Sequence, residues 1–223
     1  GHGVVLRVTD GSEAFAVQSF IITVENTNDA PVFTSEAITE ATEDEEYSYT
    51  VIAEDVDIGD EIILSTVLLP SWLSFVDNGD GTGELSGTPE NADVGDHQVE
   101  LLVTDIDGAT GTQNFTVTVE NTNDAPFFTS EEDTTATEDV NYIYSVTADD
   151  VDAGDELVIT ASTIPEWLQL VDNGDGTGEL SGTPENADVG GHGVVLRVTD
   201  GSEAFEVQSF IITVENTNDA PVF

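Results

Sequence analysis

The sequence predicts an all-β protein built of tandem Greek-key β-sandwiches with about seven strands each. Three observations support this prediction: long blocks of the chain recur at a fixed interval, apolar residues alternate with polar ones in short runs, and no segment shows sustained helical spacing. Gly, Asn, Asp and Pro separate the runs at intervals that are typical of sandwiches.

The repeat is the strongest signal in the chain. The string NDAP occurs at 28–31, 123–126 and 218–221, so its interval is 95 residues both times. Residues 76–95 recur unchanged at 171–190, and residues 1–30 recur at 191–220 with Glu206 in place of Ala16. A unit of this length can bury its own core, unlike a short solenoid repeat. We therefore expect whole repeats at 31–125 and 126–220, and the start of a further repeat at 221–223.

Residues 1–30 correspond to only the last two strands of a module, and two strands are not expected to form a core alone. We interpret this segment as the C-terminal strands of a preceding, truncated repeat. The alternative is that it pairs with another chain.

Alternation with a period of two marks the strands within each repeat. In the runs 47–54, 98–103 and 115–120, every second residue is apolar or aromatic, which predicts one inward and one outward face. Trp72 and Trp167 each follow a Pro by two residues. We expect both to anchor a core rather than to stack on a ligand.

The charge of the chain restricts its partners. It has 47 acidic and 2 basic residues, a net charge of −45, and no Cys. Nucleic acid and anionic lipid both need positive groups that neutralise phosphates, so we expect neither as a partner. The hydrophobic fraction of 38% argues against disorder. An acidic surface of the halophilic or marine kind would explain the lack of Lys, but not the ordered placing of the acids. A cation that neutralises the clustered carboxylates would explain that placing.

Acidic and amide side chains recur at three places in each repeat. They lie in the linker ENTND, in the segment EDVDIGD or DDVDAGD, and at the end of the run VTD. Oxygen ligands that include several carboxylates at short spacing favour a hard divalent cation, and calcium accepts such sets more readily than magnesium does. A single Asp-x-Asp pair is more simply read as a turn. Three groups that recur in register beside a linker ending in Pro favour a metal site.

The segment DNGDG, at 77–81 and 172–176, also looks like a calcium loop. It is one residue too short for an EF-hand and has no helical pattern on either side. Because Asn-Gly and Asp-Gly are strong hairpin signals, we predict a turn here.

The end of each repeat, VENTNDAPVF or VENTNDAPFF, resembles the linker of cadherins, in which an Asp-x-Asn-Asp-Asn segment precedes Pro-x-Phe. The segments GELSGTPE and VTD are similar to the dystroglycan-type cadherin-like repeats of large bacterial surface proteins. The resemblance covers the whole chain. It implies Ig-like or cadherin-like sandwiches with calcium at the junctions between successive modules, held by the module before, the linker and the module after.

Carried over by position, this resemblance assigns ligands to three junctions. For the junction at 120–126 they are Glu43, Glu90, Asn121, Asn123, Asp124, Asp150, Asp152 and Asp200. For the earlier junction they are Asn26, Asn28, Asp29, Asp55, Asp57 and Asp105, and for the later one Glu138, Glu185, Asn216, Asn218 and Asp219.

The chain departs from the cadherin pattern at three points. Asn121 stands where cadherins usually have Asp, the linker is one residue shorter before its Pro, and Ser202 replaces the acid found at Asp107. We therefore expect fewer ions per junction than in animal cadherins, one or two, with unequal occupancy.

We do not expect an enzyme. The three His residues, His2, His97 and His192, occupy one position in successive repeats, and an active site is not usually copied into every module of an array. Without Cys or a phosphate-binding Gly cluster, nucleophilic and phosphoryl chemistry have little to work with. Carboxylate pairs could serve a glycosidase, but repeated loop acids fit a metal better.

The sequence and the resemblance together favour one function. They predict calcium-rigidified extender modules of a large bacterial cell-surface adhesin, outside the cell, whose partners are neighbouring modules of the same chain. The main alternative is a calcium-dependent module that binds polysaccharide or another surface protein. A third possibility, adhesion between copies through an edge strand, is opposed by the like charge of the surface.

Overall fold

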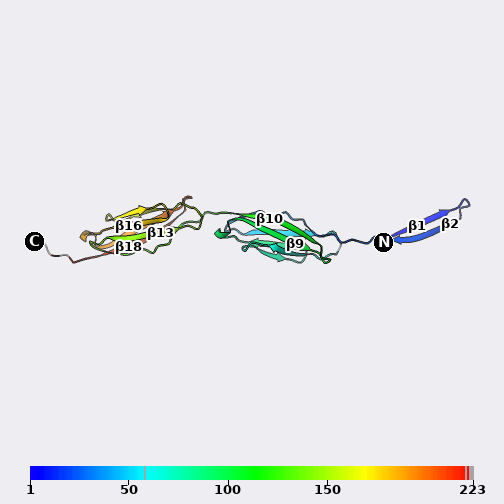
Figure 1. Cartoon of the computed structure of the whole chain (residues 1–223), viewed down its shortest axis with the longest axis horizontal. Helices are drawn as coiled ribbons and strands as arrows, with labels where there is room; N and C mark the ends of the chain where they lie inside the picture. Colours follow the sequence, from blue (N-terminus) through cyan, green and yellow to red (C-terminus); the bar gives the residue numbers. More distant parts are fainter. Residues whose placement is uncertain (58, 219, 221–223) are drawn as a thin grey trace. The chain divides into compact units, whose positions relative to one another are not determined.

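The computed structural model describes residues 1–57, 59–218 and 220. The chain divides into two compact units, Gly1–Glu120 and Asn121–Phe223, and each contains one β-sandwich (Figure 1). Within the described residues the helices are two single turns, η1 (Asn91–Asp93) and η2 (Asn186–Asp188), and neither could span a membrane. The predicted all-β class and the tandem sandwiches are confirmed. The repeat boundaries at 31–125 and 126–220 stay predictions, and residues 221–223 lie outside the described part.

The sandwich of the first unit has two four-stranded sheets. One has the order β3-β5-β8-β7 and the other the order β4-β10-β9-β6. Their strands are β3 (Val32–Phe33), β4 (Glu40–Thr42), β5 (Tyr47–Glu54), β6 (Ile63–Leu68), β7 (Ser74–Asp77), β8 (Thr82–Gly87), β9 (Gly95–Thr104) and β10 (Thr110–Glu120).

The sandwich of the second unit repeats this topology. Its sheets have the orders β11-β13-β16-β15 and β12-β18-β17-β14. Their strands are β11 (Phe127–Phe128), β12 (Thr135–Thr137), β13 (Tyr142–Asp149), β14 (Val158–Thr163), β15 (Leu168–Asp172), β16 (Thr177–Gly182), β17 (Gly190–Thr199) and β18 (Phe205–Glu215).

The first strand of each sandwich is split between the two sheets. β3 pairs antiparallel with β5, whereas β4 pairs parallel with β10, the last strand of the module. The same division separates β11 from β12. Each module therefore has eight strand segments in place of about seven continuous strands, because its opening segment joins both sheets.

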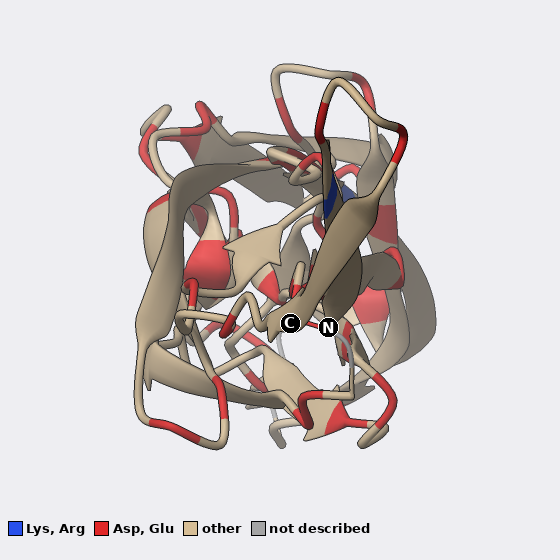
Figure 2. Ribbon diagram, turned by 90° about the vertical axis from the view of Figure 1, so that its right-hand side faces the viewer, with Lys and Arg blue, Asp and Glu red and all other residues tan. Residues whose placement is uncertain are grey.

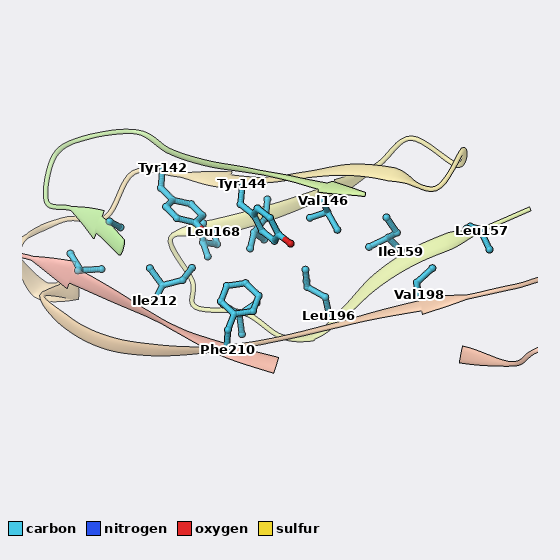
Figure 3. Packing of buried hydrophobic residues seen from close by; sticks show 14 residues of the cluster. Tyr142, Tyr144, Val146, Leu157, Ile159, Leu168, Leu196, Val198, Phe210 and Ile212 are labelled. Atoms are coloured by element: carbon cyan, nitrogen blue, oxygen red, sulfur yellow. The ribbon is translucent and has the colours of Figure 1, made fainter. Parts of the chain in front are cut away.

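The core of each sandwich comes from the alternating positions that the sequence predicts. In the second unit Tyr142, Tyr144 and Val146 of β13 face Leu196 of β17 and Ile212 of β18 (Figure 3). All five are at most 4% exposed. In the first unit the inward residues of β5 and β9 are buried in the same way. Apolar area removed from water in these two clusters is the main favourable contribution to folding.

The two Trp residues pack on the cores, as predicted. Trp72 is partly buried and meets Tyr47 edge to face, with ring centroids 5.7 Å apart. The ring of His97 also meets Trp72 edge to face, with ring centroids 5.9 Å apart. Trp167 and His192 repeat the arrangement in the second unit. The recurring His is thus a packing residue beside the Trp.

The DNGDG segment forms the turn between β7 and β8, as predicted. Gly79 and Gly81 have φ of +76° and +84°, a backbone region that favours Gly. The carboxylate of Asp77 accepts the N–H of Gly79 at 2.9 Å, and that of Asp80 accepts the N–H of Thr82 at 3.0 Å. These acids act as turn caps, and the same contacts recur at 172–177.

Residues 1–22 form a two-stranded hairpin of β1 (His2–Thr9) and β2 (Phe15–Ile22). Its pairing matches that of β17 with β18, because Val8 lies opposite Ala16 as Val198 lies opposite Glu206. Burial differs sharply: Leu6 is 52% exposed, while the corresponding Leu196 is fully buried. The hairpin therefore has the strand pairing of β17 and β18 without the core that buries them.

Candidate metal centre

Three segments of the second unit meet at one end of its sandwich. They are the linker that precedes β11, the loop 150–155 that follows β13, and the turn 200–204 that follows β17. Figure 2 shows Asp and Glu on many of the loops that join the strands. These three segments contain several of the ligands assigned from the sequence.

The linker is bound to the acids of the module that follows it. Asn121 Nδ2 donates to Asp152 Oδ1 at 2.9 Å, and the backbone N–H of Asp124 donates to Asp152 Oδ2 at 2.7 Å. Asn123 Nδ2 donates to Asp200 Oδ2 at 2.9 Å. Asp152 and Asp200 are both only 6% exposed. The linker thus supplies donors to two buried carboxylates, which a flexible spacer would not do.

Each of these acids is also fixed by its own loop. The other oxygen of Asp200 accepts the backbone N–H groups of Ser202 at 2.9 Å and Ala204 at 2.8 Å, which closes the turn between β17 and β18. Asp152 donates its own N–H to Asp150 Oδ1 at 3.0 Å. Short Asp side chains hold such local backbone bonds readily, so the D-x-D and VTD sequences position the carboxylates without help from a helix.

The first unit contains a second copy of this arrangement. Asn26 Nδ2 and the N–H of Asp29 donate to the two oxygens of Asp57, the latter at 2.7 Å, and Asn28 Nδ2 donates to Asp105 Oδ2 at 2.8 Å. Asp57 and Asp105 are buried. The structure therefore brings together the linker, D-x-D and VTD residues that the sequence assigned to one site, and it does so twice.

A further acid lies in each cluster that the assigned ligand set omitted. Oxygen atoms of Asp55, Asp60 and Asp105 lie within 4.8 Å of one another, and so do those of Asp150, Asp152 and Asp155. The omitted residues are Asp60 and Asp155, the last acids of the repeated DVDxGD segment. The cadherin pattern did not point to them, but their recurrence in both repeats was a visible signal.

The electrostatics divide the acids into two kinds. The N–H of Asp29 and the amide of Asn26 hold the pKa of Asp57 below its ordinary value. The amides of Asn28 and Asn123 lower the pKa of Asp105 and of Asp200 in the same way. These three groups are therefore stabilised as carboxylates.

Asp60 and Asp155 behave in the opposite way. Burial, followed by the negative charge of the neighbouring Asp55, raises the pKa of Asp60. Burial, followed by the charge of Asp150, raises that of Asp155. Burial and the charges of the neighbouring acids thus both oppose ionisation of these two carboxyl groups.

Each cluster borders an open acidic hollow. In the first unit a hollow of about 450 Å³ is lined by Asp55, Asp57, Asp60 and the Gly79–Gly81 turn. In the second unit the corresponding hollow measures about 370 Å³ and is lined by the equivalent loop and by Gly174 and Asp175. A solvated cation has access to both clusters.

Glu138 lies at the other end of its sandwich. Its side chain is 1% exposed, and its Oε2 accepts the N–H of Thr217 at 2.9 Å. Its own N–H donates to the carbonyl of Glu215 at 3.0 Å. Glu43 has the same burial, and its N–H donates to the carbonyl of Glu120 at 3.0 Å. Each is a buried acid beside the end of the last strand of its own module.

Glu90 and Glu185 are placed differently. Both are exposed and cap the single-turn helices η1 and η2, where their N–H groups donate to Asp93 at 3.1 Å and Asp188 at 2.9 Å. Neither belongs to the two carboxylate clusters above. The capping accounts for the PENAD sequence, which otherwise reads as an acidic motif.

The last linker is described only in part. Asn216 is exposed and its Nδ2 donates to the carbonyl of Thr217 at 3.0 Å. Asn218 is also exposed. Asp219 lies outside the described residues.

Solved structures with a similar fold include cadherin domains. PcdhgB3 EC1-4 is 18% identical over 97% of this chain and 57% of its own, with a TM-score of 0.69. Protocadherin Gamma B2 extracellular cadherin domains 1-5 are 16% identical over 98% of this chain and 47% of their own, with a TM-score of 0.62. Identities this low show the fold alone. They support a tandem array of cadherin-like or Ig-like sandwiches.

An endo-fucoidan hydrolase from glycoside hydrolase family 107 also matches. It is 23% identical over 97% of this chain and 34% of its own, with a TM-score of 0.41, which is too low to bear on catalysis. This chain therefore spans between about a third and somewhat more than half of the length of these three solved chains.

No curated protein sequence matches the chain. A family model does match, and the residues that it covers are 30–120 and 125–215, the greater part of the sequence. Its description is "Putative Ig domain" (He_PIG). The chain belongs to this family of Ig-like domains, of which it contains two in tandem.

Proposed function

We propose that these modules are calcium-rigidified extenders of a large bacterial cell-surface adhesin, with calcium bound at the junctions between successive modules. The single observation that supports this most strongly is the behaviour of the linker sequence ENTN. Before a module, its Asn side chains contact the buried acids of that module, as Asn121 and Asn123 contact Asp152 and Asp200. After a module, its Thr contacts the buried acid of that module, as Thr217 contacts Glu138.

Because the repeats are nearly identical, a linker that joins two modules should combine both roles. We propose that the linker 120–126 then places Asn and Asp oxygens between Glu43 of the module before and Asp150, Asp152 and Asp200 of the module after. Glu90, which caps η1 in the present structure, would be a peripheral ligand.

The residues fit a calcium ion in kind. An Asn amide can turn either end toward its neighbours, so an amide whose Nδ2 donates to a carboxylate can instead present Oδ1 to a cation bound by that carboxylate. Carboxylates together with neutral amide oxygens form the oxygen-only set that calcium accepts with six to eight ligands. The short linker supplies enough ligands for one or two ions at each junction.

The proposed mechanism is electrostatic. Without a cation, carboxylates of two modules and of the linker repel one another and the junction can hinge. One divalent ion that binds all three pieces replaces this repulsion with attraction and restricts the angle between modules. Extracellular modules bind calcium with Kd on the order of 10⁻⁴–10⁻³ M, which suits an extracellular location.

The composition agrees with such a location. The chain has no Cys to supply disulfides, so a bound ion would be its means of stabilisation outside the cell. The partners proposed for each module are its neighbours in the same chain. Near-identical repeats suit a segment whose role is to extend the protein.

Small-angle scattering tests the proposal. We expect the radius of gyration of the chain to increase on addition of 10 mM calcium, roughly ten to a hundred times the Kd stated above, and to fall again with excess chelator. Magnesium at the same concentration is the control and should have a smaller effect. An unchanged radius of gyration in calcium and in chelator would rule the extender function out.

A second candidate function, binding of a carbohydrate or of another protein, is favoured by one observation. The outward face of the β17–β18 sheet exposes Phe205, Val207 and Ile211, and the guanidinium of Arg197 lies 3.8 Å from the ring centroid of Phe205. The corresponding positions of β10 are Thr110, Thr112 and Thr116. At these three positions the second module thus exposes apolar side chains where the first has Thr.

Sedimentation with insoluble polysaccharides tests this alternative. If the face binds, wild-type chain should be depleted from solution, and Phe205→Ala should reduce the depletion severalfold by removing stacking on a sugar ring. The control is Thr110→Ala, at the matched position of the first module. Equal depletion by wild type and Phe205→Ala would exclude this face.

A further inference from the structure

We propose that Asp60 and Asp155 are direct cation ligands, so that each module holds one calcium ion with oxygens from its own loops and preceding linker. The proposal rests on the calcium function proposed above and refines its ligand set.

The geometry is the first argument. In the first unit, one carboxylate oxygen each from Asp55, Asp60 and Asp105 lies within 4.8 Å of the other two. In the second unit the same is true of Asp150, Asp152 and Asp155. Oxygens that bind one calcium ion at 2.3–2.6 Å can be at most about 5 Å apart. Each group can therefore surround a single ion without moving its loops.

Unpaired oxygens are the second and independent argument. Within the part of the chain that the structure describes, the Oδ2 atoms of Asp55 and Asp60 are buried and have no hydrogen-bond partner, and the same is true of those of Asp150 and Asp155. By contrast, the oxygens of Asp57 and Asp105 accept N–H donors from the linker. A buried carboxylate oxygen without a donor is costly, and a bound cation would satisfy it.

The two copies show which members are constant. Asp55 and Asp60 correspond to Asp150 and Asp155, and these pairs occur in both close groups, while the third member is Asp105 in one and Asp152 in the other. The neighbouring apolar residue also differs, Ile62 in the first hollow and Leu157 in the second. The two carboxylates of the pair therefore stay close together although the third acid and the neighbouring apolar residue differ.

A purely structural role for Asp60 finds less support. The loop that contains Asp60 is closed by a backbone hydrogen bond, in which the N–H of Asp60 donates to the carbonyl of Asp57 at 3.3 Å. The side chain of Asp60 takes no part in this bond. Asp80, which lines the same hollow, shows what a structural acid looks like here: its Oδ1 accepts both the N–H and the hydroxyl of Thr82. Asp60 Oδ2 has no such donor.

The test compares two paired variants of the whole chain. In the first, Asp60→Asn and Asp155→Asn remove one charge from each cluster. In the control, Asp80→Asn and Asp175→Asn remove the same charges from the same two hollows. Calcium affinity is measured by isothermal titration, bound calcium by atomic emission after dialysis, and Tm by calorimetry in calcium and in chelator.

We expect the first variant to be more stable than wild type in chelator but to bind calcium more weakly. In chelator its Tm should rise above that of wild type, because an uncompensated buried charge is removed. In calcium its affinity should fall about tenfold or more, as loss of a charged ligand implies, and the bound calcium should fall with it. The control variant should keep the wild-type affinity within about twofold.

Other outcomes separate this proposal from the function on which it rests. If wild type binds calcium and the first variant binds it equally well, the ligand assignment is wrong and the extender function stands. If the first variant melts lower than wild type in both conditions with an unchanged calcium shift, the acids are structural. If wild type itself shows no calcium binding, both proposals fail.

Discussion

Replacing Asp57 and Asp152 with Ala in one chain should abolish most of the calcium-dependent rise in Tm. Each carboxylate accepts a linker amide and a linker backbone N–H, and each is buried. The double variant therefore loses the group through which the linker, the loop and the cation are coupled. We expect its Tm in chelator to fall as well, because the linker donors lose their acceptors.

The size of the effect follows from mass action. A ligand present at 100 times its Kd stabilises the native state by about 2.7 kcal/mol, and 1 kcal/mol moves the Tm of a domain of this size by roughly 4–8 °C. Wild type should gain on the order of 10 °C or more in saturating calcium, and the double variant a small part of that. Calorimetry in calcium and in chelator measures both. A full calcium shift in the double variant would refute the assigned sites.

Replacing Gly182 with Ala should unfold or severely destabilise the second module. Gly182 ends β16, and a Cβ atom there would lie 1.9 Å from the backbone carbonyl oxygen of Trp167. A backbone atom cannot rotate away as a side chain can, so β15 and β16 would have to separate. We expect a loss of about 3 kcal/mol or more, which lowers the Tm by more than roughly 10 °C.

A matched control lies in the same module. Gly193 of β17 has open space where its Cβ would be, so Gly193→Ala should keep the Tm within a few degrees. Calorimetry of the two variants measures the two Tm values. Equal melting of Gly182→Ala and Gly193→Ala would mean that β15 and β16 do not pack as described.

Most of the fold could be predicted from the sequence because period-two alternation reports directly on burial. Tyr47, Tyr49 and Val51 alternate with polar or exposed residues, and all three are buried in β5. The core role of Trp72 and the turn at Gly79–Gly81 were also predictable, since both depend on local chemistry. The splitting of the first strand was not, because β3 and β4 are two and three residues long and their pairing is decided by distant strands.

The candidate site could be predicted in part. The linker and D-x-D residues were found because they recur in register, and the structure brings Asn123 and Asp200 together although 77 residues separate them. Asp60 recurs in register too, as the last acid of EDVDIGD, but the ligand set carried over from cadherins did not include it. Glu90 was included through the cadherin resemblance, and the capping contact that it makes with Asp93 was not foreseen.

A crystal structure of the whole chain grown in 10 mM calcium, with anomalous scattering to locate the ions, would show whether calcium binds in these clusters. We expect an ion in each cluster, with an Asn oxygen of the linker beside it. Its carboxylate ligands would be Asp55, Asp57, Asp60 and Asp105 in one cluster and Asp150, Asp152, Asp155 and Asp200 in the other. Clusters that hold only water at that concentration, with the linker amides turned away from the acids, would contradict this expectation.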